Sequence, residues 1–213
     1  MAPLTRTAHI VGGGNPPRAD WIYQAMEEAD LLICADSGAD ALWKRGLIPH
    51  VVCGDLDSIS DEARRGMEAQ NVTFRTFPVQ KDQTDTELAV GLALEAGMSD
   101  LELSGMDGGR VDHLLANYLL GLRYGRKCRL RILGEQHRAW VVTSDLHFAA
   151  EPGQVVSVIP LEDCQGVWLQ GLAYPLENGT LIRGTTLGNS NAAATGDIRV
   201  RLAAGMALVV HSW

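Results

Sequence analysis

Two short acidic segments contain the residues of this sequence whose types and spacing could do chemistry. Asp55 and Asp57 stand in the first segment, and Asp82 and Asp85 follow Lys81 in the second. Carboxylates spaced this closely are too costly to bury unpaired, so they do not belong to a hydrophobic core. Oxygen ligands of this kind suit Mg²⁺, which usually joins one or two carboxylates to the phosphates of a substrate. With the lysine as a positive charge for phosphate oxygens, the segments indicate metal-dependent phosphoryl chemistry on a small substrate.

The spacing of Asp55 and Asp57 has more than one interpretation. Both follow an apolar run at 51–53 that predicts a strand, and residues two apart in an extended chain point to the same side, so both carboxylates can converge on one metal. A solvated turn with Asx hydrogen bonds is the structural alternative. An Asp-x-Asp after a strand also resembles the haloacid dehalogenase phosphatases, in which the first Asp is a nucleophile. Those enzymes usually carry Thr or Val where this chain has Ile59, and the rest of their pattern fits poorly.

The second segment combines a helix start with further charges. Thr84 and Glu87 have the form of a capping box, which predicts a helix that begins here. Capping and the helix dipole explain these two residues without any function. They do not explain Lys81 and Asp82 just upstream. Asp82 and Asp85 are one helical turn apart and could both face one cation.

A second helical pattern begins at Arg110, and its polar residues share a face. At 100° per residue, Arg110, His113 and Asn117 lie on one side of the helix. Asp112 falls in the first turn, where a helix N-terminus favours carboxylates and anionic ligands. This cluster behind a glycine-rich loop favours function over an isolated structural histidine. The predicted apolar face of the same helix comprises Val111, Leu114, Leu115, Tyr118, Leu119 and Leu122.

Two other polar segments give weaker signals. The three glycines at 12–14 form neither GxGxxG nor a Walker lysine loop, and they are equally typical of a plain turn between a strand and a helix. Residues 188–191 form the one polar cluster that stands out in the second half of the chain. On composition alone, a turn between strands explains that cluster.

Composition indicates an ordinary globular protein. The chain has 213 residues, of which 46% are hydrophobic and 21% charged. A net charge of −8 argues against nucleic acid as a partner, but not against a nucleotide triphosphate that binds with a metal. Apolar runs are too short for a membrane span, and the N-terminal residues lack the pattern of a signal peptide. Cys34, Cys53, Cys128 and Cys164 are scattered, with no spacing typical of a metal site, and Cys34 and Cys53 lie in apolar runs that predict small core residues. We expect a cytoplasmic protein.

Up to about residue 133, short apolar runs alternate with amphipathic stretches, which is typical of βαβ units around a parallel sheet. The predicted strands are 9–11, 31–35, 51–53 and 101–103. Ligands of such sheets bind at the carboxyl ends of the strands. Glycine- and aspartate-rich loops stand at those ends, at 12–14, 36–38, 54–57 and 105–110.

After residue 133 the helical pattern disappears. Short β-branched runs separated by turn residues predict strands at 140–142, 155–159, 166–169, 180–182 and 207–210. Asn178-Gly179 predicts a hairpin. We therefore expect an α/β, Rossmann-like catalytic domain over residues 1–134 and an all-β sandwich or barrel over residues 135–213.

Six motifs follow one another along the chain. They are Gly-Gly-Gly at 12–14, Ala-Asp-Ser-Gly-Ala at 35–39, Gly-Asp-Leu-Asp-Ser at 54–58, Lys-Asp-Gln-Thr-Asp at 81–85, Gly-Arg-Val-Asp-His at 109–113 with Asn117, and Ser190-Asn191. In this order they resemble the thiamine pyrophosphokinase family over nearly the whole chain. The resemblance implies Mg²⁺-dependent transfer of pyrophosphate from ATP to thiamine, giving thiamine diphosphate and AMP. It also implies a second domain that binds thiamine, and a homodimer with active sites at the subunit interface.

The resemblance further implies roles for individual residues. It makes Asp55, Asp57 and Asp85 ligands of Mg²⁺, and it places Asp82 and Asp112 beside the metal, the phosphates or the substrate. The implied ATP contacts are Gly13, Asp36, Ser37, Lys81, Thr84, Arg110 and His113.

Ser190 and Asn191 would contact thiamine from the second domain. Three other functions stay open at this point. A pyrophosphokinase for another alcohol, such as a hydroxymethylpterin, would share the first domain and differ in the pocket for the acceptor. A metal-dependent phosphatase would act without any acceptor. A non-catalytic nucleotide-binding module would be indifferent to Mg²⁺.

Overall fold

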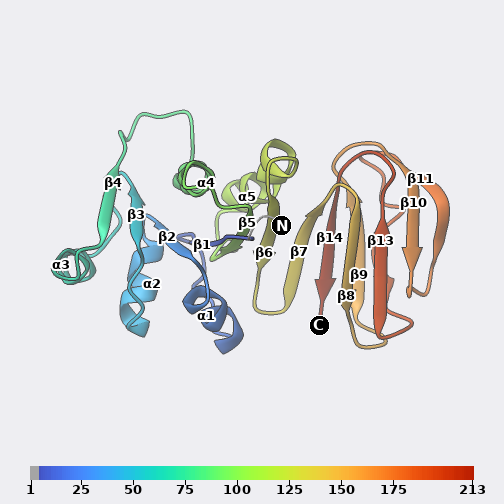
Figure 1. Cartoon of the computed structure of the whole chain (residues 1–213), viewed down its shortest axis with the longest axis horizontal. Helices are drawn as coiled ribbons and strands as arrows, with labels where there is room; N and C mark the ends of the chain where they lie inside the picture. The colour runs from blue at the N-terminus through green and yellow to red at the C-terminus, as the bar shows by residue number, and fades with distance from the viewer. Residues whose placement is uncertain (1–4) are drawn as a thin grey trace. The chain divides into compact units, whose positions relative to one another are not determined.

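The computed structural model describes residues 5–213, which form two compact units (Figure 1). The first unit contains the described residues up to Leu120 together with Ile132–Glu135. The second contains Gly121–Arg131 and Gln136–Trp213. Helix α5 (Val111–Tyr124) and strand β6 (Arg129–Leu133) each run from one unit into the other along the chain.

The first unit is a parallel sheet with helical crossovers. Its strands pair in the order β5-β1-β2-β3-β4, and every pairing is parallel. The strands are β1 (Thr7–Val11), β2 (Leu31–Ala35), β3 (Val51–Gly54), β4 (Thr73–Thr76) and β5 (Asp100–Ser104). The helices before α5 are α1 (Asp20–Glu27), α2 (Gly38–Arg45), α3 (Asp61–Ala69) and α4 (Asp85–Glu95). The α/β architecture predicted for this half is confirmed.

Helices cover both faces of the central strands, which explains why β2 and β3 are apolar throughout. On one face, Val11, Leu32 and Val52 pack with residues of α1, α2 and α3, such as Ile22 and Leu42. Helix α4 packs on β1, β2 and β3, and Figure 1 shows α4 on the other side of these strands from α1 and α2. The sheet is therefore rigid where its strands end, and the loops after those strands start from fixed positions.

The helix starts follow local capping chemistry. The Thr84 hydroxyl accepts a hydrogen bond from the Glu87 backbone N–H at 3.2 Å, so the predicted cap of α4 is confirmed. Ser60 caps α3 in the same way through the Ala63 N–H. At the start of α2, a Cβ on Gly38 would lie 2.4 Å from the Val11 carbonyl oxygen, so this helix can approach β1 only with glycine there.

The strands of the second unit pair antiparallel, which agrees with the predicted all-β domain. Four of them pair in the order β12-β9-β14-β7, and four others form a separate sheet of order β11-β10-β13-β8. Their core joins residues of both, such as Val156 and Val209 with Leu169 and Ile198. The strands are β7 (His137–Val142), β8 (Asp145–Ala149), β9 (Val155–Pro160), β10 (Cys164–Gln170), β11 (Leu176–Leu181), β12 (Asn191–Ala192), β13 (Asp197–Arg201) and β14 (Ala207–Ser212).

The hairpin predicted at Asn178-Gly179 is wrong, because both residues lie inside strand β11. Asn178 has φ of 51°, a left-handed conformation that asparagine tolerates. The register of β11 against β10 shifts at this point, so the left-handed residue produces a bulge rather than a turn.

Two other expectations concern the whole chain. All four cysteines are buried free thiols, which confirms the prediction that Cys34 and Cys53 are small core residues. Within residues 5–213, none of the helices has the length and apolar character that crossing a membrane requires.

Candidate functional site

A cavity of about 460 Å³ opens at the carboxyl ends of the strands of the first unit. Its walls come from the loops after β1, β2, β3 and β5, and from the segment that leads into α4. All four loops singled out in the sequence therefore contribute to one site. Its lining includes all seven residues expected to contact ATP, namely Gly13, Asp36, Ser37, Lys81, Thr84, Arg110 and His113, together with Asp55, Asp85 and Asn117.

The five aspartates expected to be catalytic are distributed unevenly. Asp55 and Asp85 line the cavity. Asp57 is exposed beside Asp55, to which it is bonded through its backbone. Asp82 and Asp112 are exposed and are not part of the cavity lining.

Three carboxylates converge closely enough to share a cation. Asp36, Asp55 and Asp57 each offer an oxygen, and these oxygens lie within 4.8 Å of one another. An all-oxygen, carboxylate donor set fits a hard divalent cation such as Mg²⁺. The expected set was Asp55, Asp57 and Asp85, so the structure adds Asp36 to the two residues of the Asp-x-Asp segment.

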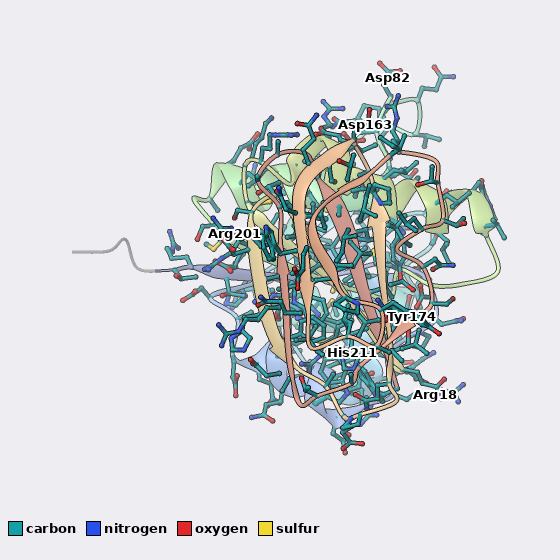
Figure 2. The ribbon with its side chains drawn as sticks, turned by 90° about the vertical axis from the view of Figure 1, so that its right-hand side faces the viewer. Arg18, Asp82, Asp163, Tyr174, Arg201 and His211 are labelled. Carbon is teal, nitrogen blue, oxygen red and sulfur yellow. The ribbon has the colours of Figure 1, made fainter. Side chains whose placement is uncertain are left out.

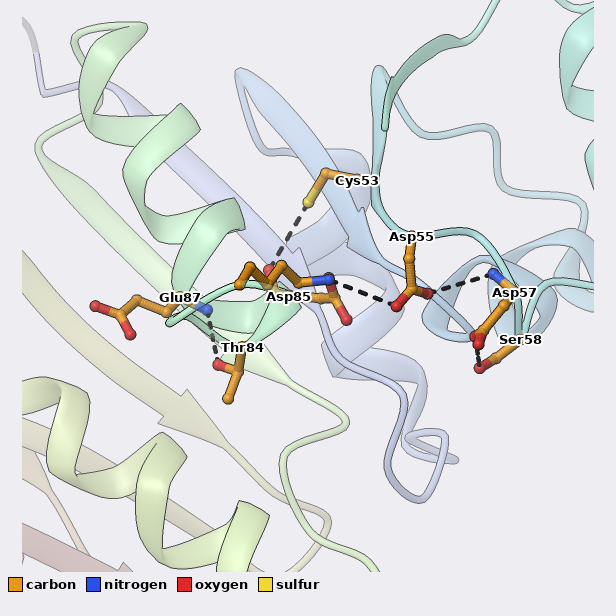
Figure 3. A network of polar contacts seen from close by, with 8 residues as sticks. Cys53, Asp55, Asp57, Ser58, Thr84, Asp85 and Glu87 are labelled. Atoms are coloured by element: carbon orange, nitrogen blue, oxygen red, sulfur yellow. Dashed lines mark hydrogen bonds and ion pairs between the residues drawn. The ribbon is translucent and has the colours of Figure 1, made fainter. Parts of the chain in front are cut away.

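Asp55 and Asp57 converge through a turn rather than through an extended strand. Leu56 between them has φ of 64°, and its side chain is buried in the core. The Asp57 backbone N–H donates to Asp55 Oδ1 at 3.4 Å, and the Ser58 hydroxyl donates to Asp57 Oδ1 at 2.9 Å (Figure 3). The buried leucine anchors the turn and leaves both carboxylates on its polar side.

Asp36 is the member of the cluster that the sequence did not mark as a metal ligand. It follows β2, has φ of 47°, and donates its backbone N–H to the Cys53 carbonyl at 2.8 Å. Within the described residues, its buried Oδ1 atom has no hydrogen-bond partner. Burial, with smaller contributions from Asp85 and Asp55, raises the pKa of Asp36 above its usual range. A cation at this position would supply the missing stabilisation. Asp36 stands at the end of β2, the strand beside β3, and this position is the sequence signal that could have identified it as a metal ligand.

Lys81 balances the negative charge of the cluster. Its Nζ atom lies 3.0 Å from Asp85 Oδ1 and 3.5 Å from Asp55 Oδ2, and its side chain is only 15% exposed (Figure 3). Burial lowers the pKa of Lys81, but hydrogen bonds and charges from Asp85 and Asp55 outweigh burial and raise it. The Asp57 N–H, and then the charge of Lys81, lower the pKa of Asp55.

The glycine loops after β1 and β5 interlock at the cavity wall. The Gly14 N–H donates to the Gly105 carbonyl at 2.9 Å. A Cβ on Gly14 would lie 2.3 Å from the Asp107 carbonyl oxygen, and one on Gly13 would lie 2.2 Å from Ser37 Oγ. These approaches explain why three successive glycines stand after β1. Asn117 of α5 supports the second loop by donating to the Met106 carbonyl at 3.4 Å.

The polar residues at and beside the start of helix α5 line the cavity, whereas most of the apolar residues of this helix are exposed. Asn117 is buried and lines the cavity with His113 and Arg110. Arg110 forms a bidentate ion pair with Asp112, with N···O distances of 2.9 and 2.5 Å. This ion pair lowers the pKa of the Asp112 carboxyl. The predicted apolar face, which would ordinarily face a core, is largely exposed. Its exposed stripe comprises Val111, Leu115, Leu119 and Leu122, with exposed fractions of 67, 54, 50 and 42%.

Ser190 and Asn191, the expected thiamine contacts, both belong to the second unit. Ser190 is exposed, has φ of 55°, and donates its backbone N–H to the Ser157 hydroxyl at 3.0 Å. Asn191 is buried, and its amide is engaged with the backbone of Tyr174. The Tyr174 N–H donates to Asn191 Oδ1 at 3.0 Å, and Asn191 Nδ2 donates to the Tyr174 carbonyl at 2.7 Å.

The fold and the cavity define a class of protein before any comparison. Carboxylates, a partly buried lysine and close-approaching glycine loops lie at the carboxyl edge of a parallel α/β sheet. This combination is typical of a metal-dependent phosphotransferase. A model of the thiamin pyrophosphokinase catalytic domain matches residues 22–133, and a model of the thiamin pyrophosphokinase vitamin B1 binding domain matches residues 143–207.

Individual relatives agree with the family models. Thiamine pyrophosphokinase of Bacillus subtilis is 31% identical over 212 residues, covering 97% of this chain and 99% of the relative. The crystal structure of the B. subtilis thiamine pyrophosphokinase matches at a TM-score of 0.86 with 30% identity, over 97% of this chain and 99% of that one. A thiamin pyrophosphokinase family structure from Enterococcus faecalis matches at 0.82 with 26% identity, over 98% and 99%. The chain belongs to the thiamin pyrophosphokinase family, and it is an enzyme of thiamine diphosphate synthesis.

Proposed function

We propose that this chain transfers the pyrophosphoryl group of ATP to the hydroxyl of thiamine, giving thiamine diphosphate and AMP, and that the cavity of the first unit is where the transfer takes place. The observation that carries this assignment is the convergence of three carboxylates at a cavity walled by glycine loops. Asp36 and Asp55 line the cavity with Lys81, and Asp57 lies beside Asp55. Pyrophosphoryl transfer needs positioning and charge neutralisation rather than a covalent nucleophile.

The cavity supplies a site for Mg²⁺. Asp36, Asp55 and Asp57 would hold the ion, with Asp85 as the nearest further carboxylate of the cavity. The fit rests on the all-oxygen donor set and on the buried Asp36 Oδ1, which lacks a hydrogen-bond partner among the described residues. When bound, the ion would neutralise charge on the transferring phosphates and orient them.

The remaining polar groups of the cavity would bind the triphosphate. Lys81 and Arg110 supply positive charge, and both line the cavity. The loops at Gly13 and Gly109 allow the backbone to approach phosphate oxygens closely. Ser37, Thr84 and His113 add hydrogen-bonding groups along the same walls.

The acceptor would bind through the second unit. The vitamin B1 binding model matches residues 143–207, which contain Ser190 and Asn191. Thiamine is a cation, so an acidic protein with a net charge of −8 suits both the metal and the acceptor.

We also propose that the protein is a homodimer whose active sites lie at the subunit interface. The exposed apolar stripe of α5 supports a protein partner, because monomers rarely leave such a face uncovered. His113 of the same helix and Arg110, which immediately precedes the helix, line the cavity, so a partner on the stripe would lie next to the site. Leu119→Lys should shift the protein toward monomer in sedimentation velocity, whereas Ala116→Lys, on another exposed face of α5, should not.

The compartment we propose is the cytoplasm. Four free, buried thiols fit a reducing environment, in which disulfides are rare.

The test of the reaction is AMP formation from ATP and Mg²⁺ with thiamine, with a hydroxymethylpterin, and with no acceptor. We expect AMP together with thiamine diphosphate in the thiamine reaction alone. AMP with the pterin instead would assign a different acceptor. Phosphate release without acceptor would assign a hydrolase.

A further inference from the structure

Three polar side chains are buried in the sheet of the first unit. Charged and polar side chains mostly project into solvent, as Arg18 and Asp82 do in Figure 2. His9 and Ser104 are instead 0% exposed, and Glu102 is 9% exposed. The cavity lining does not include these three residues, so the proposed reaction does not explain why they are there.

The register of strands β1 and β5 brings these side chains together. His9 stands directly opposite Glu102, and Val11 stands opposite Ser104. Residues two apart in a strand point to the same side, so His9, Glu102 and Ser104 share one face of the sheet. His9 Nε2 lies 2.8 Å from Ser104 Oγ, and His9 Nδ1 lies 3.5 Å from Glu102 Oε2. A carboxylate beside Nδ1 favours a proton on that nitrogen, which leaves Nε2 to accept a hydrogen bond from the Ser104 hydroxyl.

The combination of Ser104, His9 and Glu102 resembles the nucleophile arrangement of serine hydrolases, but Ser104 cannot act as a nucleophile. The residue is 0% exposed, so no substrate reaches its hydroxyl. A buried hydrogen bond between two side chains instead fixes the position of both, because neither group can turn to water if the bond breaks. The His9–Ser104 hydrogen bond therefore holds the end of β5 to β1.

The end of β5 is also where the cavity wall begins. Ser104 is the last residue of β5, and its carbonyl accepts a hydrogen bond from the Gly12 N–H at 2.8 Å. Gly105 follows with φ of 67°, and a Cβ there would lie 2.6 Å from the Gly12 carbonyl oxygen. The Gly105 carbonyl then accepts from the Gly14 N–H at 2.9 Å. The close approach of these two glycine loops thus depends on where β5 ends.

We propose that His9 is a positioning residue for ATP, and that it acts through Ser104 on the cavity wall formed by the loops after β1 and β5. The inference rests on the proposed function, because it takes ATP as the ligand of that wall. Gly13, Gly14 and Gly105 line the cavity. A wall that is held in place before binding lowers the ordering cost of the complex, and a displacement of about 1 Å in a positioning group can slow a reaction by about 100-fold. An apolar residue at position 9 would fill the same space without a directional bond to hold the end of β5.

The experiment measures the melting temperature, KM for ATP and KM for thiamine in the wild type and in variants of the His9–Ser104 hydrogen bond. Ser104→Ala deletes the hydroxyl oxygen, His9→Met replaces the ring with an apolar side chain of similar volume, and a double variant combines both changes. Ile22→Val is the matched control. Ile22 is also 0% exposed in the first unit but belongs to α1, so its truncation lowers stability without altering this hydrogen bond.

We expect Ser104→Ala and His9→Met each to raise KM for ATP about fivefold, with KM for thiamine within about twofold of the wild type. The double variant should raise KM for ATP no further, because either single change already breaks the same hydrogen bond. Its melting temperature should not fall below that of the less stable single variant, since removing both partners of a bond costs less than leaving one behind. Ile22→Val should lower the melting temperature and leave both KM values unchanged.

An unchanged KM for ATP in Ser104→Ala, whatever its melting temperature, would show that the hydrogen bond is only structural and would overturn the inference. Equal rises in KM for ATP and for thiamine would also overturn it, and so would an equal rise in KM for ATP in Ile22→Val. A double variant whose rise in KM is the product of the two single rises would show that His9 does not act through Ser104.

Ser104→Ala removes one atom, so the test remains decisive even if His9→Met does not fold. The proposed function has a separate criterion, which is the formation of thiamine diphosphate and AMP by the wild-type protein. Failure of the positioning role and failure of the reaction are therefore distinguishable.

Discussion

Polar side chains play opposite parts in the two units. In the cavity of the first unit, Asp36 Oδ1 has no hydrogen-bond partner among the described residues, and Lys81 is shared between Asp55 and Asp85. In the second unit, Asn191 Oδ1 accepts from the Tyr174 and Ala192 N–H groups, and Asn191 Nδ2 donates to the Tyr174 carbonyl. The incompletely paired charges of the first unit are available to a ligand but lower the stability of the fold. The hydrogen bonds of Asn191 stabilise a loop. Substitutions should therefore affect turnover in the first unit and folding or geometry in the second.

The largest effect should come from the acidic cluster. Asp57→Ala and Asp85→Ala should each lower the rate of thiamine diphosphate formation by ~10³-fold, because each removes a charge that organises the metal and the phosphates. Both residues are at least partly exposed, so the thermal melting curve should stay near that of wild type. Near-wild-type activity in both variants would contradict the metal assignment.

A sharper test of the same site uses Lys81, because the lysine and a cation compete for the same carboxylates. Lys81→Met should weaken the use of ATP by ~10²-fold, since a charge that contacts phosphate is lost. The same change should strengthen binding of Mn²⁺ alone by about tenfold, because Asp55 and Asp85 lose their ammonium partner.

Titration calorimetry with Mn²⁺, without nucleotide, measures this second effect. Arg110→Met is the matched control, since Arg110 lines the cavity but pairs with Asp112 outside the cluster. Weaker Mn²⁺ binding in Lys81→Met than in wild type would show that Lys81 does not compete with the ion.

Sequence periodicity predicted the fold class correctly, but it missed several individual strands. Strands β2 and β3 are apolar throughout because helices cover both of their faces, and β1 and β5 each contain an apolar core, so all four could be predicted from the sequence. Strands β4, β6 and β12 were not predicted. Strands β8 and β13 were also missed. Their outward positions are mostly charged or polar, as in Asp145, His147, Arg199 and Arg201, and this alternation is easily taken for loop in such short runs.

For the site, residue types were predicted better than geometry. The loops that line the cavity follow from the rule that ligands bind at the carboxyl ends of parallel strands. The inclusion of Asp36 with Asp55 and Asp57 could not follow from spacing, since it depends on the order of β2 and β3 in the sheet and on the left-handed Leu56. The apolar face of α5 also shows that a helical pattern reveals a buried face without revealing what buries it.

An intermediate effect should come from the interlocked glycine loops of the first unit. A Cβ on Gly14 would lie 2.3 Å from the Asp107 carbonyl and 2.5 Å from that of Gly105, and backbone atoms cannot move aside cheaply. Gly14→Ala should lower the free energy of unfolding by about 2 kcal/mol and reduce activity as well. Gly109→Ala is the control, because a Cβ there would meet no other atom within 4 Å. Equal unfolding midpoints in urea for Gly14→Ala and Gly109→Ala would show that a Cβ at Gly14 does not disturb the cavity wall.

The smallest effect should be a pH dependence of stability that originates in the second unit. His211 is 6% exposed, and its Nε2 lies 2.7 Å from Gln154 Oε1. Burial, and then the charge of Arg138, lower the pKa of His211 below its usual range. Below pH ~6.5 the unfolded chain therefore takes up a proton that the folded chain resists, so stability falls as the pH falls.

Urea unfolding of wild type and His211→Asn at pH 7.5 and 5.5 isolates this contribution. The wild type should lose more stability between the two pH values than the variant does, while its turnover at pH 7.5 should not depend on His211. An equal loss of stability in both proteins would mean that His211 does not contribute to the pH dependence. A loss of turnover in His211→Asn at pH 7.5 would show that His211, like the polar residues of the first unit, affects the reaction.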